Sequence, residues 1–196
     1  MKRELEESLL LIAIKMKKDI LLHVNIPEDV EISLAREGRE IKAKHKDKEI
    51  VEVFILGKLK LELDGKKLLI KALKGTKREK KLAGTIRGKI SNMIKGVIEG
   101  FTYKLQIASS HFPMRVEVDK TKGIITVKNY LGERIPRKAK ILPDVEIKIE
   151  NDIITVFSKR KEAAGQTAAN IEKTTKAGSR DKRIFQDGIY LTEKPK

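Results

Sequence analysis

The feature that most constrains the fold is an internal repeat, in which the chain of 196 residues matches itself at a fixed offset of 86. The motif Ile26–Pro27 returns as Phe112–Pro113, followed in both places by alternating apolar residues. The same offset relates later apolar residues without a gap, so that Leu59, Leu61, Leu63, Leu68, Ile70 and Ala83 correspond to Val145, Ile147, Ile149, Ile154, Val156 and Ala169. A repeat of this extent predicts two copies of one folding unit.

Each copy has the pattern of several strands followed by one helix. Apolar residues alternate with polar ones in runs such as 59–63, which is typical of half-buried strands, and Asp64–Gly65 predicts a hairpin turn. Helical spacing then extends from Thr76 to about Glu99, and again from about Glu162 to Ala177. We therefore predict an α+β fold made of two tandem copies of a small domain, each an antiparallel sheet packed by one main helix.

The repeat also predicts the domain boundaries. Residues 1–19 have no counterpart in the second copy and form an N-terminal extension. Residues 20–100 form the first α+β repeat, and residues 101–196 form the second repeat with a C-terminal tail. The apolar run Leu9–Ile14 in the extension is too short for a signal-peptide core or a membrane span, so no membrane partner is expected.

The charge balance indicates a polyanionic partner. The chain carries 44 Lys and Arg against 28 Asp and Glu, a net charge of +16, which is far more than solubility requires. Aromatic residues make up only 4% of the chain, so phosphate contacts are favoured over stacking of single-stranded bases. The absence of Cys excludes disulfides, thiolate zinc sites and cysteine nucleophiles, and is compatible with a reducing cytoplasm.

The basic residues gather in three clusters. The first covers residues 74–89 at the entrance of the first helix and includes Arg87, the second covers residues 128–140, and the third covers residues 159–183. A single run of lysines is often no more than a solvated surface. Three such clusters on two small domains favour binding of nucleic-acid phosphates.

Four glycines interrupt the first predicted helix, namely Gly84, Gly88, Gly96 and Gly100. Each costs about 1 kcal/mol relative to Ala within a helix, so each needs a compensating interaction. Two explanations fit the sequence equally well: close packing of the helix on the sheet, or close approach of an RNA backbone.

No catalytic signature is present in the sequence. The run Gly84–Lys89 resembles a phosphate-binding loop, but it has three residues between its glycines instead of four, and Ile90 stands where the magnesium-binding hydroxyl belongs. His23, His45 and His111 are scattered, without metal-ligand spacing. We therefore predict no enzyme activity, no cofactor, no metal and no small-molecule substrate.

Longer strings in the second copy are more specific than composition. They are KNYLGERIPR at residues 128–137, GQTAANIE at 165–172 and DKRIFQDGIY at 181–190, with SSHFP at 109–113 between the copies. Over about residues 20–194 the chain resembles the large-subunit ribosomal protein L-six family in its archaeal and eukaryotic form. The N-terminal extension and the basic stretch 77–81 depart from the family pattern.

The resemblance implies a cytoplasmic ribosomal protein without catalytic activity. It implies two duplicated α+β domains that bind large-subunit rRNA near the sarcin–ricin loop and the stalk base, beside the translation-factor GTPase centre. Neighbouring large-subunit ribosomal proteins are its implied further partners. The main alternative is a free-standing regulator that binds structured RNA, since composition alone does not separate the two. A phosphoryl-transfer or hydrolytic enzyme would need a nucleotide or metal motif that the sequence lacks.

The resemblance also implies that most RNA contact lies on the second domain. Arg180, Lys182 and Arg183 are predicted to contact phosphates, while Gln166 and Asn170 are predicted to hydrogen-bond sugar or phosphate from the helix start. The full predicted set is Arg87, Lys128, Arg134, Arg137, Lys138, Lys159, Arg160, Lys161, Gln166, Asn170, Lys173, Lys176, Arg180, Lys182, Arg183 and Gly188.

Within the tail, Gly188 is predicted to allow a backbone conformation that a β-branched residue would resist. For Phe185 and Tyr190 two roles stay open, burial against the sheet or stacking on bases. Burial is favoured, because the alternate residues Ile184, Gln186 and Gly188 would then face outward.

Overall fold

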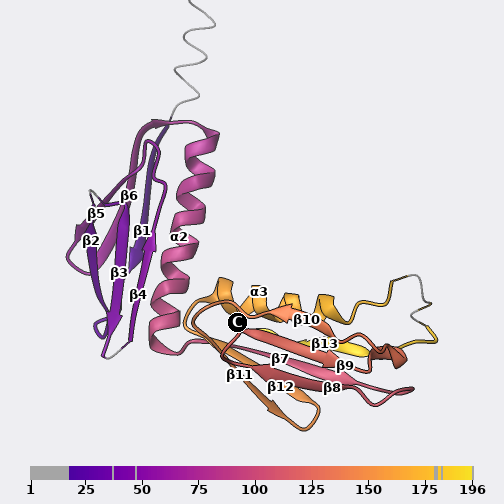
Figure 1. Cartoon of the computed structure of the whole chain (residues 1–196). Coiled ribbons are helices and arrows are strands. Elements are labelled where there is room, and N and C mark those ends of the chain that lie inside the picture. The colour runs from indigo at the N-terminus through magenta and orange to yellow at the C-terminus, as the bar shows by residue number, and fades with distance from the viewer. Residues whose placement is uncertain (1–17, 37, 47, 179–180, 182, 196) are drawn as a thin grey trace, which may run out of the picture. The chain divides into compact units, whose positions relative to one another are not determined.

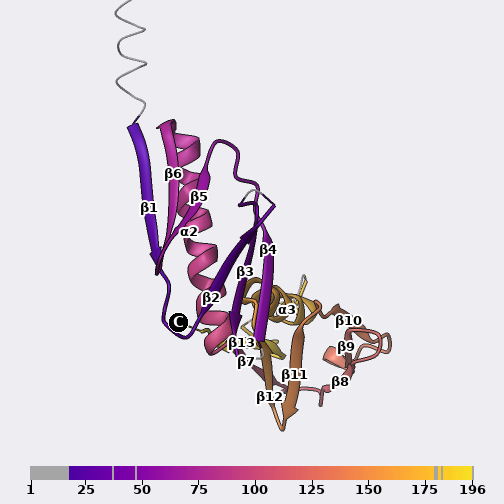
Figure 2. The same cartoon turned by 90° about the vertical axis from the view of Figure 1, so that its left-hand side faces the viewer.

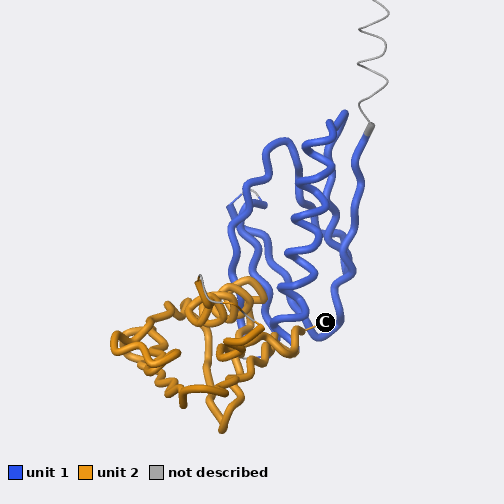
Figure 3. Tube along the Cα trace, turned by 90° about the vertical axis from the view of Figure 1, so that its right-hand side faces the viewer, with its two compact units in different colours: residues 1–98 blue, residues 99–196 orange. Residues whose placement is uncertain are grey.

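The computed structural model describes residues 18–36, 38–46, 48–178, 181 and 183–195. The chain divides into two compact units between Ile98 and Glu99, which Figure 3 shows in different colours. Most of the predicted N-terminal extension lies outside the described residues. The first strand begins at Lys18, slightly before the predicted start of the first repeat at residue 20.

Unit 1 combines strands from its first part with the long helix that comes after them (Figure 1). Its described elements are β1 (Lys18–Asn25), β2 (Glu31–Ala35), β3 (Glu40–His45), β4 (Lys48–Val53), β5 (Lys60–Asp64), β6 (Lys67–Gly75) and α2 (Lys77–Ile98). The strands form two antiparallel sheets, with the orders β1-β6-β5 and β2-β3-β4. Figure 2 shows α2 lying along one side of these strands, and it packs against strands of both sheets.

The core of unit 1 forms because α2 presents one apolar stripe to the sheets. Ala83, Ile86, Ile90 and Val97 recur at helical spacing, and each is at most 2% exposed. They belong to one cluster with inward-facing strand residues such as Leu68. The polar residues between them are left on the opposite side of the helix.

Unit 2 repeats this plan and adds a strand. Its described elements are β7 (Phe101–Ala108), β8 (Arg115–Asp119), β9 (Ile124–Lys128), the short 3-10 turn η1 (Tyr130–Gly132), β10 (Arg137–Lys140), β11 (Val145–Glu150), β12 (Ile153–Ser158), α3 (Lys161–Thr174) and β13 (Gly188–Glu193). The sheets have the orders β11-β12-β7-β13 and β10-β9-β8. The added strand β13 pairs with β7.

The helix of unit 2 packs through small residues. Ala164, Ala168 and Ile171 are buried in the core of the unit. Gly165 lies over the ring of Tyr103, and a Cβ at this glycine would lie only 3.0 Å from the Tyr103 hydroxyl oxygen. The GQTAAN string thus has a packing role, because small side chains bring α3 close to β7.

The two units share one topology, which confirms the predicted α+β fold of two tandem copies. Leu61 pairs with Ile70 in unit 1, and their counterparts at offset 86, Ile147 and Val156, pair in the same way in unit 2. The sheet β1-β6-β5 therefore corresponds to β7-β12-β11, and β2-β3-β4 to β8-β9-β10. The structure adds that each copy divides its strands between two sheets.

The offset of 86 does not extend to the first strand of each unit. The Ile26 N–H donates to the Lys66 carbonyl over 2.9 Å, and the Ile107 N–H donates to the Asp152 carbonyl over 2.7 Å. Because Asp152 is the counterpart of Lys66, Ile26 corresponds to Ile107. The predicted match of Ile26–Pro27 with Phe112–Pro113 is therefore wrong, since unit 2 carries additional residues between this position and its later hairpin.

Candidate nucleic-acid interface

The fold brings parts of the second and third basic clusters together in unit 2, where α3 lies beside β10. In Figure 1, α3 runs beside β10, and two hydrogen bonds join the helix to this part of the chain. Asn170 Nδ2 donates to the Lys140 carbonyl over 3.0 Å. Arg137 Nη1 donates to the Thr174 carbonyl over 2.8 Å. Residues at least 30 positions apart in the sequence thus lie side by side.

Successive side chains of β10 point to opposite faces of the sheet, and this alternation decides which of them reach solvent. Ala139 faces the core at 5% exposure, while Lys138 and Lys140 on either side of it are exposed. We define the α3–β10 surface as Lys138, Lys140, Gln166, Asn170, Lys173 and Lys176.

The lysines of the α3–β10 surface remain available for a partner. Among the described residues, the lysine salt bridges of unit 2 lie elsewhere, at Lys104, Lys122 and Lys128. Gln166 Nε2 donates to Asn170 Oδ1 over 2.9 Å, so these two amides form a polar pair within the surface. Four exposed ammonium groups on two neighbouring elements, together with two amides on α3, can neutralise and hydrogen-bond a phosphodiester backbone.

Arg137 has a structural role instead of facing solvent. Its Nε and Nη2 donate to the two Glu133 carboxylate oxygens over 2.7 Å each, and its guanidinium lies 4.3 Å from the centroid of the Tyr130 ring. The hydrogen bonds to Glu133 raise the pKa of Arg137 above its ordinary value. With Nη1 bound to the Thr174 carbonyl, this guanidinium fastens the end of α3 to the loop before β10. We therefore leave Arg137 out of the α3–β10 surface.

The other predicted cations do not join this surface. Lys159, Arg160 and Lys161 lie at the opposite end of α3 from Lys173, about 18 Å away along the helix axis. Lys161 Nζ lies 5.5 Å from the ring centroid of Phe101.

Four more of the predicted cations lie on other elements or in loops, and two are not described. Lys128 pairs with Glu117 over 2.7 Å, Arg134 and Arg183 are exposed in loops, and Arg87 lies on α2 of unit 1. Arg180 and Lys182 lie outside the described residues.

The C-terminal tail is fastened by a buried carboxylate that no sequence pattern singles out. Asp187 is 1% exposed and accepts hydrogen bonds from the Ser110 and His111 N–H groups. His111 Nδ1 lies 3.3 Å from Asp187 Oδ2, and the His111 ring contacts the Phe185 ring at a centroid distance of 5.5 Å. The conspicuous DGIY string therefore has a structural explanation.

The structure changes one expectation for Tyr190 and two for Gly188. Phe185 is partly buried against the core, as favoured, but Tyr190 is 47% exposed, and its hydroxyl donates to the Gln186 carbonyl over 3.0 Å. Gly188 is buried and does not face outward. A Cβ at Gly188 would lie 3.1 Å from Tyr190 Cζ, so glycine provides room for this ring and not a special backbone conformation.

Two candidate contact residues were missed. Lys140 belongs to the second cluster but was not included in the predicted set; the alternation with Ala139 could have placed it beside Lys138. Ile135 is 82% exposed between Arg134 and Pro136, and no periodicity marks it, because it lies in a loop.

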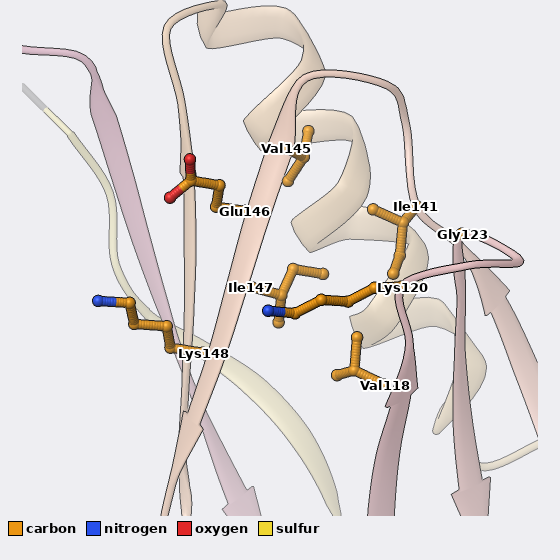
Figure 4. A pocket seen from close by; sticks show the side chains of 8 residues that line it. All are labelled: Val118, Lys120, Gly123, Ile141, Val145, Glu146, Ile147 and Lys148. Atoms are coloured by element: carbon orange, nitrogen blue, oxygen red, sulfur yellow. The ribbon is translucent and has the colours of Figure 1, made fainter.

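A pocket of about 350 Å³ in unit 2 is lined by none of the residues of this surface (Figure 4). Val118, Ile141, Val145 and Ile147 give it an apolar lining, where the edge strands β8 and β11 leave the core partly open. Lys120 reaches across it, whereas Glu146 and Lys148 point away from these side chains. The predicted RNA-binding residues do not line this pocket.

The described part of the chain contains no group of three or more His, Asp or Glu side chains that could hold a metal ion. Within the same residues, no helix is both long and apolar enough to cross a bilayer.

Comparison with known proteins gives a consistent result. The family model described as "Ribosomal protein L6" matches residues 112–188, which include the α3–β10 surface. A protein of Methanosphaera stadtmanae named "Large ribosomal subunit protein uL6" is 45% identical over 177 residues, covering 90% of this chain and 94% of that protein.

Proteins with the same name from Methanothrix thermoacetophila and Methanococcus vannielii are 37% and 40% identical. These matches cover 91% and 87% of this chain, and 99% and 92% of the two relatives. Identity of 37–45% over about nine-tenths of the chain shows that it belongs to the ribosomal protein L6 family.

Proposed function

We propose that this chain is a structural constituent of the large ribosomal subunit and binds large-subunit rRNA, with residues 20–100 and 101–196 as its two domains. The α3–β10 surface is the observation that carries the proposal, because it joins two basic clusters that the sequence keeps apart. Its relatives are named as large ribosomal subunit proteins. The net charge of +16 suits a polyanionic partner.

The mechanism is neutralisation of phosphates by side chains on a rigid support. α3 and β10 are joined through Asn170 and Arg137, so the backbone that carries the exposed lysines is ordered without the partner. Each ammonium that neutralises a phosphate releases condensed counterions, which makes affinity depend steeply on salt. The protein thereby holds folded RNA in place without performing chemistry.

The finer part of the proposal concerns the site on the ribosome. We propose that the chain binds near the sarcin–ricin loop and the stalk base of the cytoplasmic ribosome, where it supports the translation-factor GTPase centre. Chemical footprinting of large-subunit rRNA with and without the chain tests this location. Protection confined to other regions of the RNA would refute the location without refuting rRNA binding.

A salt titration tests the mechanism. If the chain contacts six to ten phosphates, affinity for deproteinised large-subunit rRNA should fall by roughly 10³–10⁵-fold between about 50 and 200 mM salt. Replacing the four lysines of the α3–β10 surface by Ala should reduce the slope of log affinity against log salt by roughly 3–4. The matched control replaces Lys104, Lys120, Lys122 and Lys148 of the same unit, and should change the slope less.

Sedimentation distinguishes the ribosomal role from a free-standing RNA-binding regulator. The native chain should travel with large subunits through a sucrose gradient in moderate salt. Recovery of the chain at the top of the gradient, near its monomer mass of 22.2 kDa, would support the regulator instead.

A further inference from the structure

The side of α2 that faces away from the core of unit 1 carries a row of residues at helical spacing. Lys77, Lys81, Gly84, Gly88 and Lys95 recur at intervals of three, four or seven residues, which places them on one line along the helix. All five are exposed, whereas the apolar residues of α2 are buried on the opposite side. We call this row the outer stripe of α2.

The two glycines of the outer stripe have no packing role in unit 1. A Cβ built at Gly84 or at Gly88 would meet no heavy atom within 4 Å. Packing on the sheet, one of the two explanations for the helix glycines, is therefore wrong at these two positions. Gly96 differs, because it is buried, and Gly100 differs because it takes a φ of +81° after the helix.

The charges around the outer stripe are of one sign. Arg78, Lys80 and Arg87 are also exposed on α2 and flank the row. Glu79 is the acidic residue of this stretch, and its carboxylate accepts hydrogen bonds from Thr76 at the start of the helix.

Within the described residues, Lys77, Lys81 and Lys95 form no salt bridge. Salt bridges elsewhere in unit 1 lie on its strands and loops, at Arg36–Glu40, Lys42–Glu40, Lys66–Glu28 and Lys71–Glu62. The cations of the outer stripe are thus left for a partner that brings negative charge.

We propose that the outer stripe of α2 is a second nucleic-acid surface, which receives the phosphodiester backbone of folded RNA between Lys81 and Lys95. The lysines supply the charge, and the missing side chains at Gly84 and Gly88 let the backbone approach the helix closely. The proposal deepens the proposed function and rests on it for the nature of the partner. A protein helix packed on the glycines is the competing occupant, but it would need an acidic row to match these cations.

The sharpest test uses the double variant Gly84→Ala and Gly88→Ala in the full chain. Ala is the better helix former and meets no neighbour at either site, so the Tm of unit 1 should rise. Affinity for deproteinised large-subunit rRNA should nevertheless fall severalfold, because two methyl groups hold the backbone away. A gain in stability together with a loss of binding is a result that misfolding does not produce.

Charge is tested separately with the double variant Lys81→Ala and Lys95→Ala. The slope of log affinity against log salt should fall by about 2, corresponding to two lost phosphate contacts. The matched control is Lys44→Ala with Lys67→Ala, which removes the same charge from exposed strand positions of unit 1 and should leave the slope nearly unchanged.

The outcomes separate this proposal from the proposed function. If the wild-type chain binds the rRNA with the expected salt dependence and the glycine variant binds equally well, the outer stripe does not contact RNA. If the glycine variant binds naked rRNA normally but enters large subunits poorly, a protein occupies the stripe and the proposal is wrong. If the wild-type chain does not bind the rRNA at all, the proposed function itself fails.

Discussion

The two units share one template but differ in the path of the chain after the helix. In unit 1, α2 runs for 22 residues and the chain then leaves the unit. In unit 2, α3 ends after 14 residues, and the chain returns as β13 beside β7. Among the described strands, β1, the counterpart of β7, pairs with β6 alone. The same arrangement of strands thus packs against either a long helix or a shorter helix that is followed by an added strand.

The different path of the chain after the helix changes the roles of polar side chains in the two units. Unit 2 uses Arg137 and Asp187 inside the unit, to hold the end of α3 and the tail that leads into β13. Unit 1 has no returning tail to hold, and the polar side of α2 stays at the surface. The longer helix α2 therefore carries more exposed cations than α3.

The shared template is tested by the same deletion in both cores. Leu68 and Ile154 correspond at offset 86, are 0% exposed and pair with Leu63 and Ile149 respectively. Replacing either by Ala should cost about 2–5 kcal/mol, because a buried cavity is left behind. Hydrogen exchange resolved by residue should show Leu68→Ala weakening unit 1 and Ile154→Ala weakening unit 2.

The exposed residue Ile153, next to Ile154 on β12, provides the control. Ile153 is 46% exposed, so Ile153→Ala should change the stability of unit 2 much less than Ile154→Ala. Equal losses from the two variants would show that burial of Ile154 in the core does not cause the loss of stability.

The feature specific to unit 2 is tested at Asp187. Asp187→Ala removes the acceptor for the Ser110 and His111 N–H groups and should cost about 2–3 kcal/mol, since both hydrogen bonds go to a charged group. Amide exchange in β13 should accelerate, while exchange in unit 1 should not change. Asp187→Asn keeps one carbonyl oxygen and should fall between the wild type and Asp187→Ala.

The same carboxylate gives unit 2 a pH dependence. Burial alone would raise the pKa of Asp187, but the N–H donors of Ser110 and His111 and the nearby His111 ring outweigh it, and the pKa is lowered. A carboxylate with a lowered folded pKa stabilises the fold above its unfolded pKa of about 3.9 and loses this contribution as pH falls further. The stability difference between the wild type and Asp187→Ala should therefore shrink below about pH 4.

The sequence predicted the fold class, both helices to within three residues and the repeat from Leu59 onward, because the spacing of apolar residues along strands and helices can be read from one sequence. Its match of Ile26–Pro27 with Phe112–Pro113 was wrong. The sequence did not predict the roles of Arg137 and Asp187. Asp187 bonds to residues more than 70 positions away, which no local pattern reveals. Arg137 could have been recognised, since it shares the covered side of β10 with Ala139. A sequence does not distinguish a basic side chain that bonds within its own unit from one that stays exposed for a partner. The contacts in the structure distinguish the two.

The smallest predicted effect concerns how the two helices begin. Thr76 precedes α2, and its N–H donates to Glu79 Oε2 over 2.8 Å, which is one half of a capping box. The Thr76 hydroxyl donates to the same oxygen, whereas Arg160 before α3 makes no side-chain cap hydrogen bond. Thr76→Ala should cost about 1 kcal/mol, and Thr76→Ser should cost less because it keeps the hydroxyl. The first turn of α2 should exchange its amides more slowly than the first turn of α3 in the wild type, and Thr76→Ala should reduce this difference. If the two first turns already exchange alike, the cap does not distinguish the units, and the greater length of α2 must rest on its apolar stripe alone.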